Sequence, residues 1–258
     1  MAKQENATIQ SVERALLALQ HIADHPERKF SLSELTEYME LDKSSVFRLL
    51  STLMKFGLVR QDEHRKTWQL GYRIFSLAGA LRGQLKITEL AASPLRELAA
   101  ATHENAHLAV RSGLKAVFID RERASKAIAS NTDIGDTEDL HCTAVGKCLI
   151  SALSADELER LYGDAPMQRY TDRTITSLRE LSAELEAVRA RGYGVDDGEF
   201  EPNVVCIAAP VYDYMGRVEA AIGISGPRER METQFDRFSD EVRGAGRELS
   251  ALLGFQPG

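Results

Sequence analysis

The sequence predicts an α+β protein with two domains joined by a helix. Three amphipathic helical segments and a following pair of short alternating runs predict a winged helix-turn-helix domain over residues 1–71. Residues 87–258 mix helical segments with paired β-rich runs, which predicts an antiparallel sheet flanked by helices. A helical segment at 72–86 lies between them. The 258 residues can bury a sizeable core, and 43% hydrophobic and 28% charged residues are ordinary for a globular protein.

Composition and the N-terminus exclude several classes of protein. No run of 18 apolar residues is present, so we expect no membrane span. The opening MAKQENATIQ is polar and has no apolar signal core, which predicts a cytoplasmic location. The three cysteines, Cys142, Cys148 and Cys206, are too few and odd in number for a disulfide framework.

The net charge of −7 argues at first against a nucleic-acid partner, but the charge is unevenly distributed. Residues 1–86 hold 13 Lys and Arg against 10 Asp and Glu, whereas the remaining residues hold 19 against 29. This asymmetry predicts either a basic contact module on an acidic body or a merely solvated charged surface on the first domain.

The first two helical segments carry recognisable end signals. In SVERALLALQHIADH, apolar residues recur at helical spacing after Ser11, a plausible N-cap. SLSELTEYM repeats the pattern, with Ser31 and Glu34 at the spacing of a capping box. Both segments are therefore predicted to be helices.

The third segment, ELDKSSVFRLLSTLMKFG, is the most informative of the first domain. Asp42 is a good N-cap and Gly57 a good residue to follow the last turn. One face is apolar, and the opposite face is small, polar and basic with no acid: Ser44, Arg48, Ser51 and Lys55. This composition suits a helix that enters the DNA major groove, where Arg48 can reach a guanine edge and Lys55 a phosphate.

Two short alternating runs, LVRQD and TWQLG, follow and are joined by EHRK, which predicts a β-hairpin. Three helices and a basic hairpin describe a winged helix-turn-helix, although a small helical domain with a solvated charged surface is the alternative. The predicted DNA-binding residues are Lys43, Ser44, Ser45, Arg48, Ser51, Lys55, Arg65 and Lys66.

The remaining elements follow in order. YRIFSLAGALRGQL has an apolar face that needs the body or a second copy as partner. SPLRELAAAT predicts a helix with Ser93 as N-cap and Pro94 at the first helical position. NAHLAVRS and KAVFIDRE form one predicted hairpin, and VVCIAAPVY and RVEAAIGISG another. Helices are predicted in TAVGKCLISAL, SADELERLY and SLRELSAELEAVRARG and over about 231–253.

At this point two motifs show a specific resemblance. LHCTAVGKCLIS and the block YGVDDGEFEPNVVCIAAPVYDYMGRVEAAIGISGP resemble the effector domain of the IclR family of bacterial transcription regulators, and the winged helix lies where that family has it. The resemblance covers nearly the whole chain. It implies a GAF-like effector domain, a small organic acid as effector, assembly into dimers or dimers of dimers, and a double-stranded, palindromic DNA operator.

The resemblance also implies a pocket. The cysteine of the CIAAP strand lines it in this family, so Cys206 is expected there, with Gly223 and Ser225 on the next strand. Gly223, where members often have Ser, implies room for a bulkier acid, and Asp196 is either a polar pocket group or a turn residue. The predicted effector-binding residues are His141, Cys142, Thr143, Ala144, Val145, Gly146, Asp196, Cys206, Gly223 and Ser225.

The loop GDTEDLHCTAVGK is expected to close the pocket. Backbone N–H groups at the start of the following helix, near Thr143, Ala144 and Val145, suit a carboxylate. His141 either adds a charge-assisted contact or caps the loop.

Cys206 also has two chemical interpretations. Its apolar flanks raise a thiol pKa, which argues against a nucleophile, and the absence of a CxxC spacing argues against structural zinc. His103 and His107 would lie too far apart along a strand to share a metal. We therefore expect a regulator that is not an enzyme and has no metal or cofactor. The rival is a thiol-dependent hydrolase or ligand-binding protein using Cys206 and His141, with the N-terminal module as a protein-docking domain.

Overall fold

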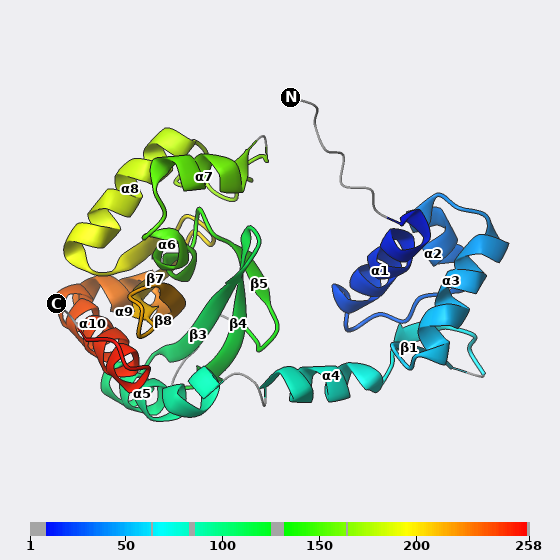
Figure 1. Ribbon diagram of the computed structural model, residues 1–258, viewed down its shortest axis with the longest axis horizontal. Coiled ribbons are helices and arrows are strands. Elements are labelled where there is room, and N and C mark those ends of the chain that lie inside the picture. The colour runs from blue at the N-terminus through cyan, green and yellow to red at the C-terminus, as the bar shows by residue number, and fades with distance from the viewer. Residues whose placement is uncertain (1–8, 63, 83–85, 125–131, 164, 257–258) are drawn as a thin grey trace. The chain divides into compact units, whose positions relative to one another are not determined.

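The computed structural model describes residues 9–62, 64–124, 132–163 and 165–256, apart from 83–85, and divides the chain into two compact units, Met1–Leu85 and Lys86–Gly258 (Figure 1). None of the helices in the described part of the chain has the length and apolar character that a membrane crossing requires. Each unit has its own buried core, as expected for two domains.

The first unit consists of three helices, a hairpin and a fourth helix. In chain order these are α1 Gln10–Ala23, α2 Leu32–Met39, α3 Lys43–Lys55, β1 Val59–Gln61, β2 Trp68–Leu70 and α4 Arg73–Arg82. The strands pair antiparallel, which confirms the predicted hairpin. Trp68 is fully buried, and its backbone exchanges two hydrogen bonds with Phe30, so the hairpin is tied to the segment between α1 and α2.

The predicted N-cap residues are correct for two of the first three helices, α2 and α3. Ser31 and Glu34 form the predicted capping box of α2, and the Asp42 side chain caps α3 by accepting from the backbone N–H of Ser45. The Ser11 prediction is wrong, because α1 begins at Gln10 and Ile9, two residues before Ser11, occupies the N-cap position without a side-chain cap.

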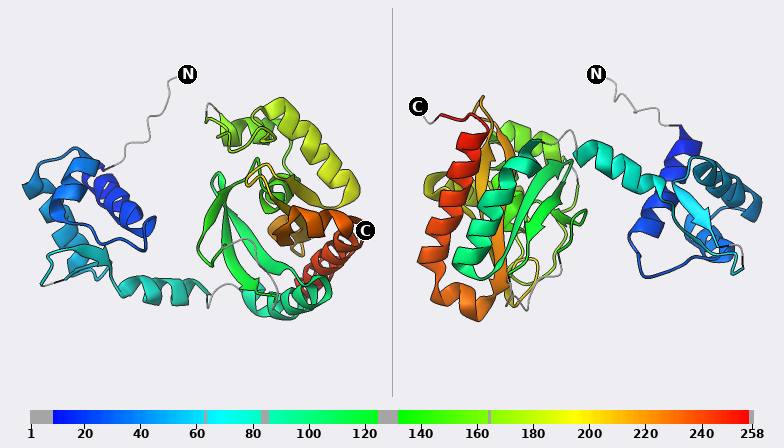
Figure 2. Two further views of the ribbon diagram at one scale, coloured as in Figure 1. Left: turned by 180° about the vertical axis from the view of Figure 1, so that it is seen from behind. Right: turned by 90° about the horizontal axis from the view of Figure 1, so that it is seen from below.

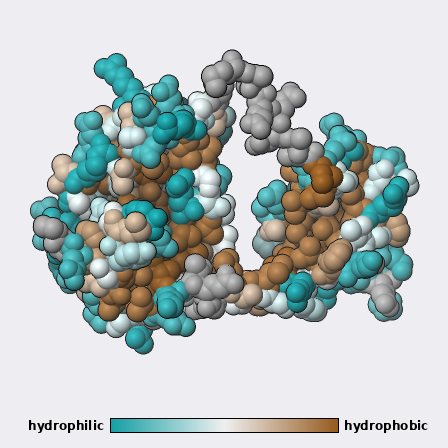
Figure 3. All heavy atoms as spheres, in the orientation of Figure 1, coloured by the Kyte–Doolittle hydropathy of each residue, from teal (hydrophilic) through white to brown (hydrophobic). Residues whose placement is uncertain are grey.

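Helix α4 presents apolar side chains to solvent. Phe75 is 82% exposed, Leu77 49% and Leu81 56%. In Figure 3 the spheres of this helix are largely brown. An exposed apolar face of this kind is unusual on the surface of a single chain.

The second unit is built on a six-stranded antiparallel sheet in the order β5-β4-β3-β8-β7-β6. The strands are β3 Asn105–Ser112, β4 Lys115–Glu122, β5 Thr137–Asp139, β6 Gly194–Asp197, β7 Val204–Tyr212 and β8 Val218–Pro227. Both predicted hairpins are present. The short edge strands β5 and β6 were not predicted, since three or four residues carry too little alternation to be recognised.

Helices cover both faces of this sheet (Figure 2). They are α5 Lys86–Thr102, α6 Ala144–Ile150, α7 Ala155–Tyr162, α8 Leu178–Arg191, α9 Arg228–Thr233 and α10 Phe235–Leu252. α5 and α10 pack together on one side, and α6 packs on the other with α8 outside it. The predicted helix over 231–253 is in fact two, divided at Gln234.

The predicted start of α5 is wrong. The helix begins at Lys86, so Pro94 lies inside it rather than in its first turn. Proline removes one helical hydrogen bond. The flanking turns of α5 bury apolar residues, among them Ile87, Ala91, Leu95 and Leu98, and this packing outweighs the local signal.

Candidate functional site

The predicted DNA-contacting residues lie together on the first unit. Lys43, Ser44, Arg48 and Lys55 are exposed along α3, and Ser45 and Ser51 are half-buried on the same helix. The helix contains no acidic residue. Its outer face therefore presents a basic stripe to solvent.

The N-terminus of α3 is fixed by its cap. Asp42 Oδ1 accepts from the Ser44 hydroxyl at 2.5 Å and from the Ser45 backbone N–H at 2.9 Å. These hydrogen bonds, with that from the Ser44 hydroxyl as the largest contribution, hold the pKa of Asp42 well below its usual range. The Ser44 hydroxyl therefore donates its hydrogen to the cap. Arg48 and Lys55 are the long side chains of the basic stripe whose N–H groups can donate to DNA.

The hairpin tip is ordered in a similar way. Asp62 Oδ1 accepts from the backbone N–H groups of His64 and Arg65, each at 3.0 Å. Lys66 has a positive φ of 55°, so the chain turns sharply here and both Arg65 and Lys66 are exposed. The tip carries two cations that are free to meet a phosphate.

A pocket with about 70 Å³ of free volume lies in the second unit, between the start of α6 and the sheet. Six predicted residues line it: Thr143, Ala144, Val145, Asp196, Cys206 and Ser225. The sheet register explains part of this set, because Asp196 pairs with Cys206 and Cys206 pairs with Ser225. These three residues form one cross-strand row on one face of the sheet.

The other four predicted residues do not line the pocket. His141 is buried and its Nε2 is 2.9 Å from the Gln168 carbonyl oxygen, which fits a loop-capping role rather than a ligand contact. Cys142 is buried nearby. Gly146 packs against Leu140, where a Cβ would approach the Leu140 backbone to 2.4 Å.

The idea that Gly223 leaves room for a bulkier ligand is wrong. A Cβ at this position would lie 2.6 Å from the Ile207 carbonyl oxygen and 2.8 Å from the Ala208 Cβ, so the glycine allows a close approach of β7 and β8. A pocket of about 70 Å³ suits a compact molecule.

Seven lining residues were not predicted: His107, Phe118, Thr132, Glu138, Phe200, Glu201 and Val204. His107 could have been found by alternation, since it shares a sheet face with Ala109 on β3. Burial lowers its pKa to about 4, so it is neutral at pH 7. Glu138 comes from the short strand β5, which gives no readable sequence signal.

The charged groups of the pocket are carboxyls. Burial raises the pKa of Glu138 to about 8, and burial raises the pKa of Asp196 to about 7 although Asp196 Oδ1 accepts from the Glu199 backbone N–H at 2.6 Å. Among the described lining residues there is no Lys or Arg. At neutral pH these carboxyls therefore hold protons for part of the time and can donate hydrogen bonds.

The Ser225 hydroxyl also lacks a protein partner. Ser225 is 2% exposed, and its Oγ makes no hydrogen bond in the described structure. A buried hydroxyl without a partner is unfavourable by about 1–3 kcal/mol. Its position in the pocket lining indicates that a bound molecule completes its hydrogen bonding.

The thiols are not activated. Burial raises the pKa of Cys206 well above its usual value, and burial raises the pKa of Cys148 to about 12. The neighbouring carboxyls Asp196 and Glu138 add to the effect at Cys206. No group of three potential metal ligands occurs among the described His, Cys, Asp and Glu side chains.

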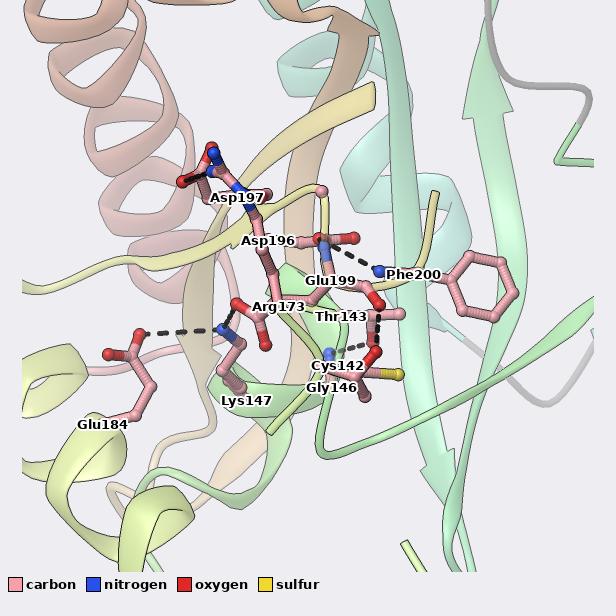
Figure 4. Close-up of polar contacts among 12 residues, drawn as sticks. Cys142, Thr143, Gly146, Lys147, Arg173, Glu184, Asp196, Asp197, Glu199 and Phe200 are labelled. Carbon is pink, nitrogen blue, oxygen red and sulfur yellow. Dashed lines mark hydrogen bonds and ion pairs between the residues drawn. The ribbon is translucent and has the colours of Figure 1, made fainter. Parts of the chain in front are cut away.

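A buried ion pair joins α6 to the segment that follows β6, next to the pocket wall. Lys147 Nζ on α6 lies 2.5 Å from Glu199 Oε1 and 3.7 Å from Glu184 Oε1 on α8 (Figure 4). Lys147 is 1% exposed, so these two carboxylates are the counter-charges for a buried ammonium group. Since Glu199 donates its backbone N–H to Asp196, the network links α6 and α8 to the pocket wall.

Comparisons with known proteins agree with this arrangement. Residues 80–251 match the family model described as bacterial transcriptional regulator IclR C-terminal, and residues 11–63 match the IclR helix-turn-helix domain. The HTH-type transcriptional regulator BhcR of Paracoccus denitrificans is 31% identical over 251 residues, which cover 97% of this chain and 89% of BhcR. The HTH-type transcriptional repressor AllR of Klebsiella pneumoniae is 32% identical, over 96% of this chain and 91% of AllR.

Solved structures show the same fold. The Thermotoga maritima IclR structure has a TM-score of 0.73 at 27% identity and covers 96% of this chain and all of its own. An IclR homologue from Microbacterium hydrocarbonoxydans, solved in complex with 4-hydroxybenzoate, has a TM-score of 0.79 at 20% identity, over 94% of this chain and 98% of its own.

Proposed function

The chain belongs to the IclR family of bacterial transcriptional regulators, and from this premise we propose a one-component regulator whose operator affinity is set by a compact organic acid. The proposal that the pocket binds a ligand rests on the Ser225 hydroxyl, which lines the pocket and has no hydrogen-bond partner among the described residues. A homologue of the same fold binds 4-hydroxybenzoate, which supports an organic acid as the ligand class.

The pocket offers hydrogen-bond donors to such an acid. The first N–H groups of α6, at Ala144 and Val145, have no intrahelical partner, as at every helix start. The Ser225 hydroxyl and the protonated forms of Asp196 and Glu138 add further donors. A ligand carboxylate would accept from these groups, and its negative charge would favour the protonated state of the two carboxyls.

For DNA, we propose that α3 enters the major groove with Arg48 toward a base edge, while Lys55, Arg65 and Lys66 meet phosphates. The exposed apolar face of α4 supports self-association, so we propose a dimer, or a dimer of dimers, on a palindromic operator. Such a regulator works where the chromosome lies, in the cytoplasm. Effector binding would change operator affinity by favouring one spacing of the paired α3 helices, with a coupling of about 1–3 kcal/mol.

We also propose that the protein catalyses no reaction. A Cys206 nucleophile would need a lowered pKa and a neighbouring base, whereas burial raises its pKa and the His141 Nε2 is occupied by the Gln168 carbonyl. The rival hydrolase would turn over activated esters in a reaction that iodoacetamide blocks.

Fluorescence anisotropy on DNA from upstream of its own and adjacent genes, with random DNA as control, tests the DNA half. We expect preferential binding that weakens linearly with log salt concentration. The same assay then screens organic acids, with Ser225→Ala as the key variant. This variant should keep operator affinity and lose most of the effector response. Equal affinity for operator and random DNA at every salt concentration would contradict the proposal, and so would a full effector response in Ser225→Ala.

A further inference from the structure

A second cleft, with about 490 Å³ of free volume, lies on the second unit between the end of α8, the end of β7 and α10. The three elements meet near the C-terminus (Figures 1 and 2). Its rim carries four arginines, Arg189 and Arg191 from α8 and Arg243 and Arg247 from α10, and none of its described lining residues is acidic. This is unexpected in residues 87–258, which hold only 19 Lys and Arg against 29 Asp and Glu.

Two of the four guanidinium groups have carboxylate partners outside the cleft. Arg191 Nη2 is 2.6 Å from Glu184 Oε1, and Arg243 pairs with Asp240. The other two have none among the described residues. Arg189 donates to the Ser151 carbonyl oxygen at 2.7 Å. Arg247 makes no hydrogen bond or ion pair with any described residue. The cleft therefore has an excess of positive charge.

Protein folding alone does not favour this arrangement. Arg243 and Arg247 are spaced i, i+4 on α10, where like charges repel and destabilise a helix. The Arg243 Nε is buried and has no hydrogen-bond partner. A buried donor of this kind is unfavourable unless a bound group accepts from it.

The floor of the cleft is apolar and partly aromatic. Ala209, Pro210 and Ala251 line it together with Tyr212 and Phe255, whose rings stack with centroids 5.1 Å apart. β6 pairs with β7 only as far as Ala208, and beyond it the Tyr212 backbone N–H donates to the Ser250 hydroxyl of α10 at 2.9 Å. The free volume is within the range of sites that bind small ligands.

We infer that this cleft binds a phosphorylated small molecule, with the phosphate among Arg243, Arg247 and Arg189 and an apolar or planar body against Tyr212 and Phe255. Guanidinium groups form paired, charge-assisted hydrogen bonds to phosphate oxygens, which accounts for the choice of arginine over lysine. The site is separate from the Cys206 pocket, since the two share no lining residue.

Isothermal titration calorimetry of the full-length protein tests this at constant ionic strength, with inorganic pyrophosphate, ADP and adenosine as probes. We expect pyrophosphate and ADP to bind and adenosine not to bind. Tighter binding of ADP than of pyrophosphate would support an organic phosphate, and binding of ADP no tighter than pyrophosphate would refute a body held against Tyr212 and Phe255. Adenosine binding as well as ADP, or no binding of either phosphate at millimolar concentration, would overturn the inference.

Variants make the test specific. Arg247→Gln should weaken binding about tenfold or more, as loss of a charge-assisted contact does. The matched control is Arg179→Gln, which removes the same charge from an exposed position of α8 outside the cleft. Wild-type affinity in Arg247→Gln, or an equal loss in Arg179→Gln, would refute a site at these arginines. The anisotropy assays of operator binding and of the organic-acid response are separate from this calorimetric test. A negative result at the arginine cleft therefore does not contradict the proposed function, and a failure of the proposed function does not contradict phosphate binding at the cleft.

Discussion

Replacing Lys147 by Met should destabilise the second unit strongly while leaving the first unit unchanged. Lys147 Nζ lies 2.5 Å from Glu199 Oε1, and the Glu199 side chain is only 10% exposed. Loss of the cation leaves that carboxylate buried without a counter-charge, and breaking a buried pair in this way costs about 3–5 kcal/mol. A domain with about 5–15 kcal/mol of stability would lose a large part of it.

The chain contains its own reporter for this experiment. Its one tryptophan, Trp68, is buried in the first unit, so tryptophan fluorescence follows that unit alone, whereas far-UV circular dichroism follows both. With a urea slope of roughly 2 kcal/mol per M, the dichroism transition of the second unit should fall by about 2 M while the fluorescence transition stays fixed. Urea titration of the full-length protein measures both.

Two further variants decide the cause. Lys147→Met combined with Glu199→Met removes the unpaired charge and should recover stability to within about 1–2 kcal/mol of wild type. Arg173→Met breaks the exposed pair with Asp197, whose side chain is 54% exposed, and should lose no more than about 1 kcal/mol. A loss below about 1 kcal/mol for Lys147→Met, or no recovery in the double variant, would refute the reasoning.

Three other outcomes are expected. Arg48→Ala should cost about 1–3 kcal/mol of operator binding and relax sequence preference, whereas Lys55→Ala should weaken all DNA similarly; equal loss on operator and random DNA for Arg48→Ala would exclude base reading. Native Cys206 should react with iodoacetamide at least about tenfold more slowly than free cysteine, because burial raises its pKa, and should be alkylated at the normal rate in urea; mass spectrometry checks both. The folded protein keeps protons on Glu138 and Asp196 that the unfolded chain releases near pH 4. The free energy of unfolding should therefore fall by up to about 1.4 kcal/mol per pH unit per group as the pH rises from about 4 toward 7 for Asp196 and 8 for Glu138. Urea midpoints measured across this pH range should show the slope, and the slope should flatten in the double variant Glu138→Gln, Asp196→Asn.

The parts of the fold that were predictable are those set by neighbouring residues. Asp42 caps α3 because its side chain reaches the backbone three residues on, and Gly57, with φ of 72°, follows the helix because glycine tolerates that conformation. The same logic failed at Pro94, where a local helix-start signal lies inside a helix whose buried face decides the conformation. Local chemistry is therefore a good guide to helix ends that are exposed and a poor one to helices held by a core.

The sites needed long-range pairing that no local pattern contains. Glu138 lies on a strand of only three residues, and the four cleft arginines come from segments more than fifty positions apart. Cys206 and Ser225 were anticipated from the resemblance to a family. Gly223 shows where inference from the family fails. The missing side chain predicts room for a larger ligand, but atoms of Ile207 and Ala208 on β7 occupy that space.

The pocket follows from the register of the sheet. Asp196, Cys206 and Ser225 are directly opposite one another on three adjacent strands, and Asn105 continues the row on β3. The next row contains Gly194, Ala208 and Gly223 and ends at His107 on β3, so three small residues lie beside Asp196, Cys206 and Ser225. A slip of one residue in any pairing would move that strand's member of the row to the α10 face, where Ile207 and Ile224 now lie in the buried core. Asp196 and Ser225 are the buried members of this row, and the Ser225 hydroxyl has no hydrogen-bond partner among the described residues, so a ligand that bonds to it would both bind and stabilise the second unit.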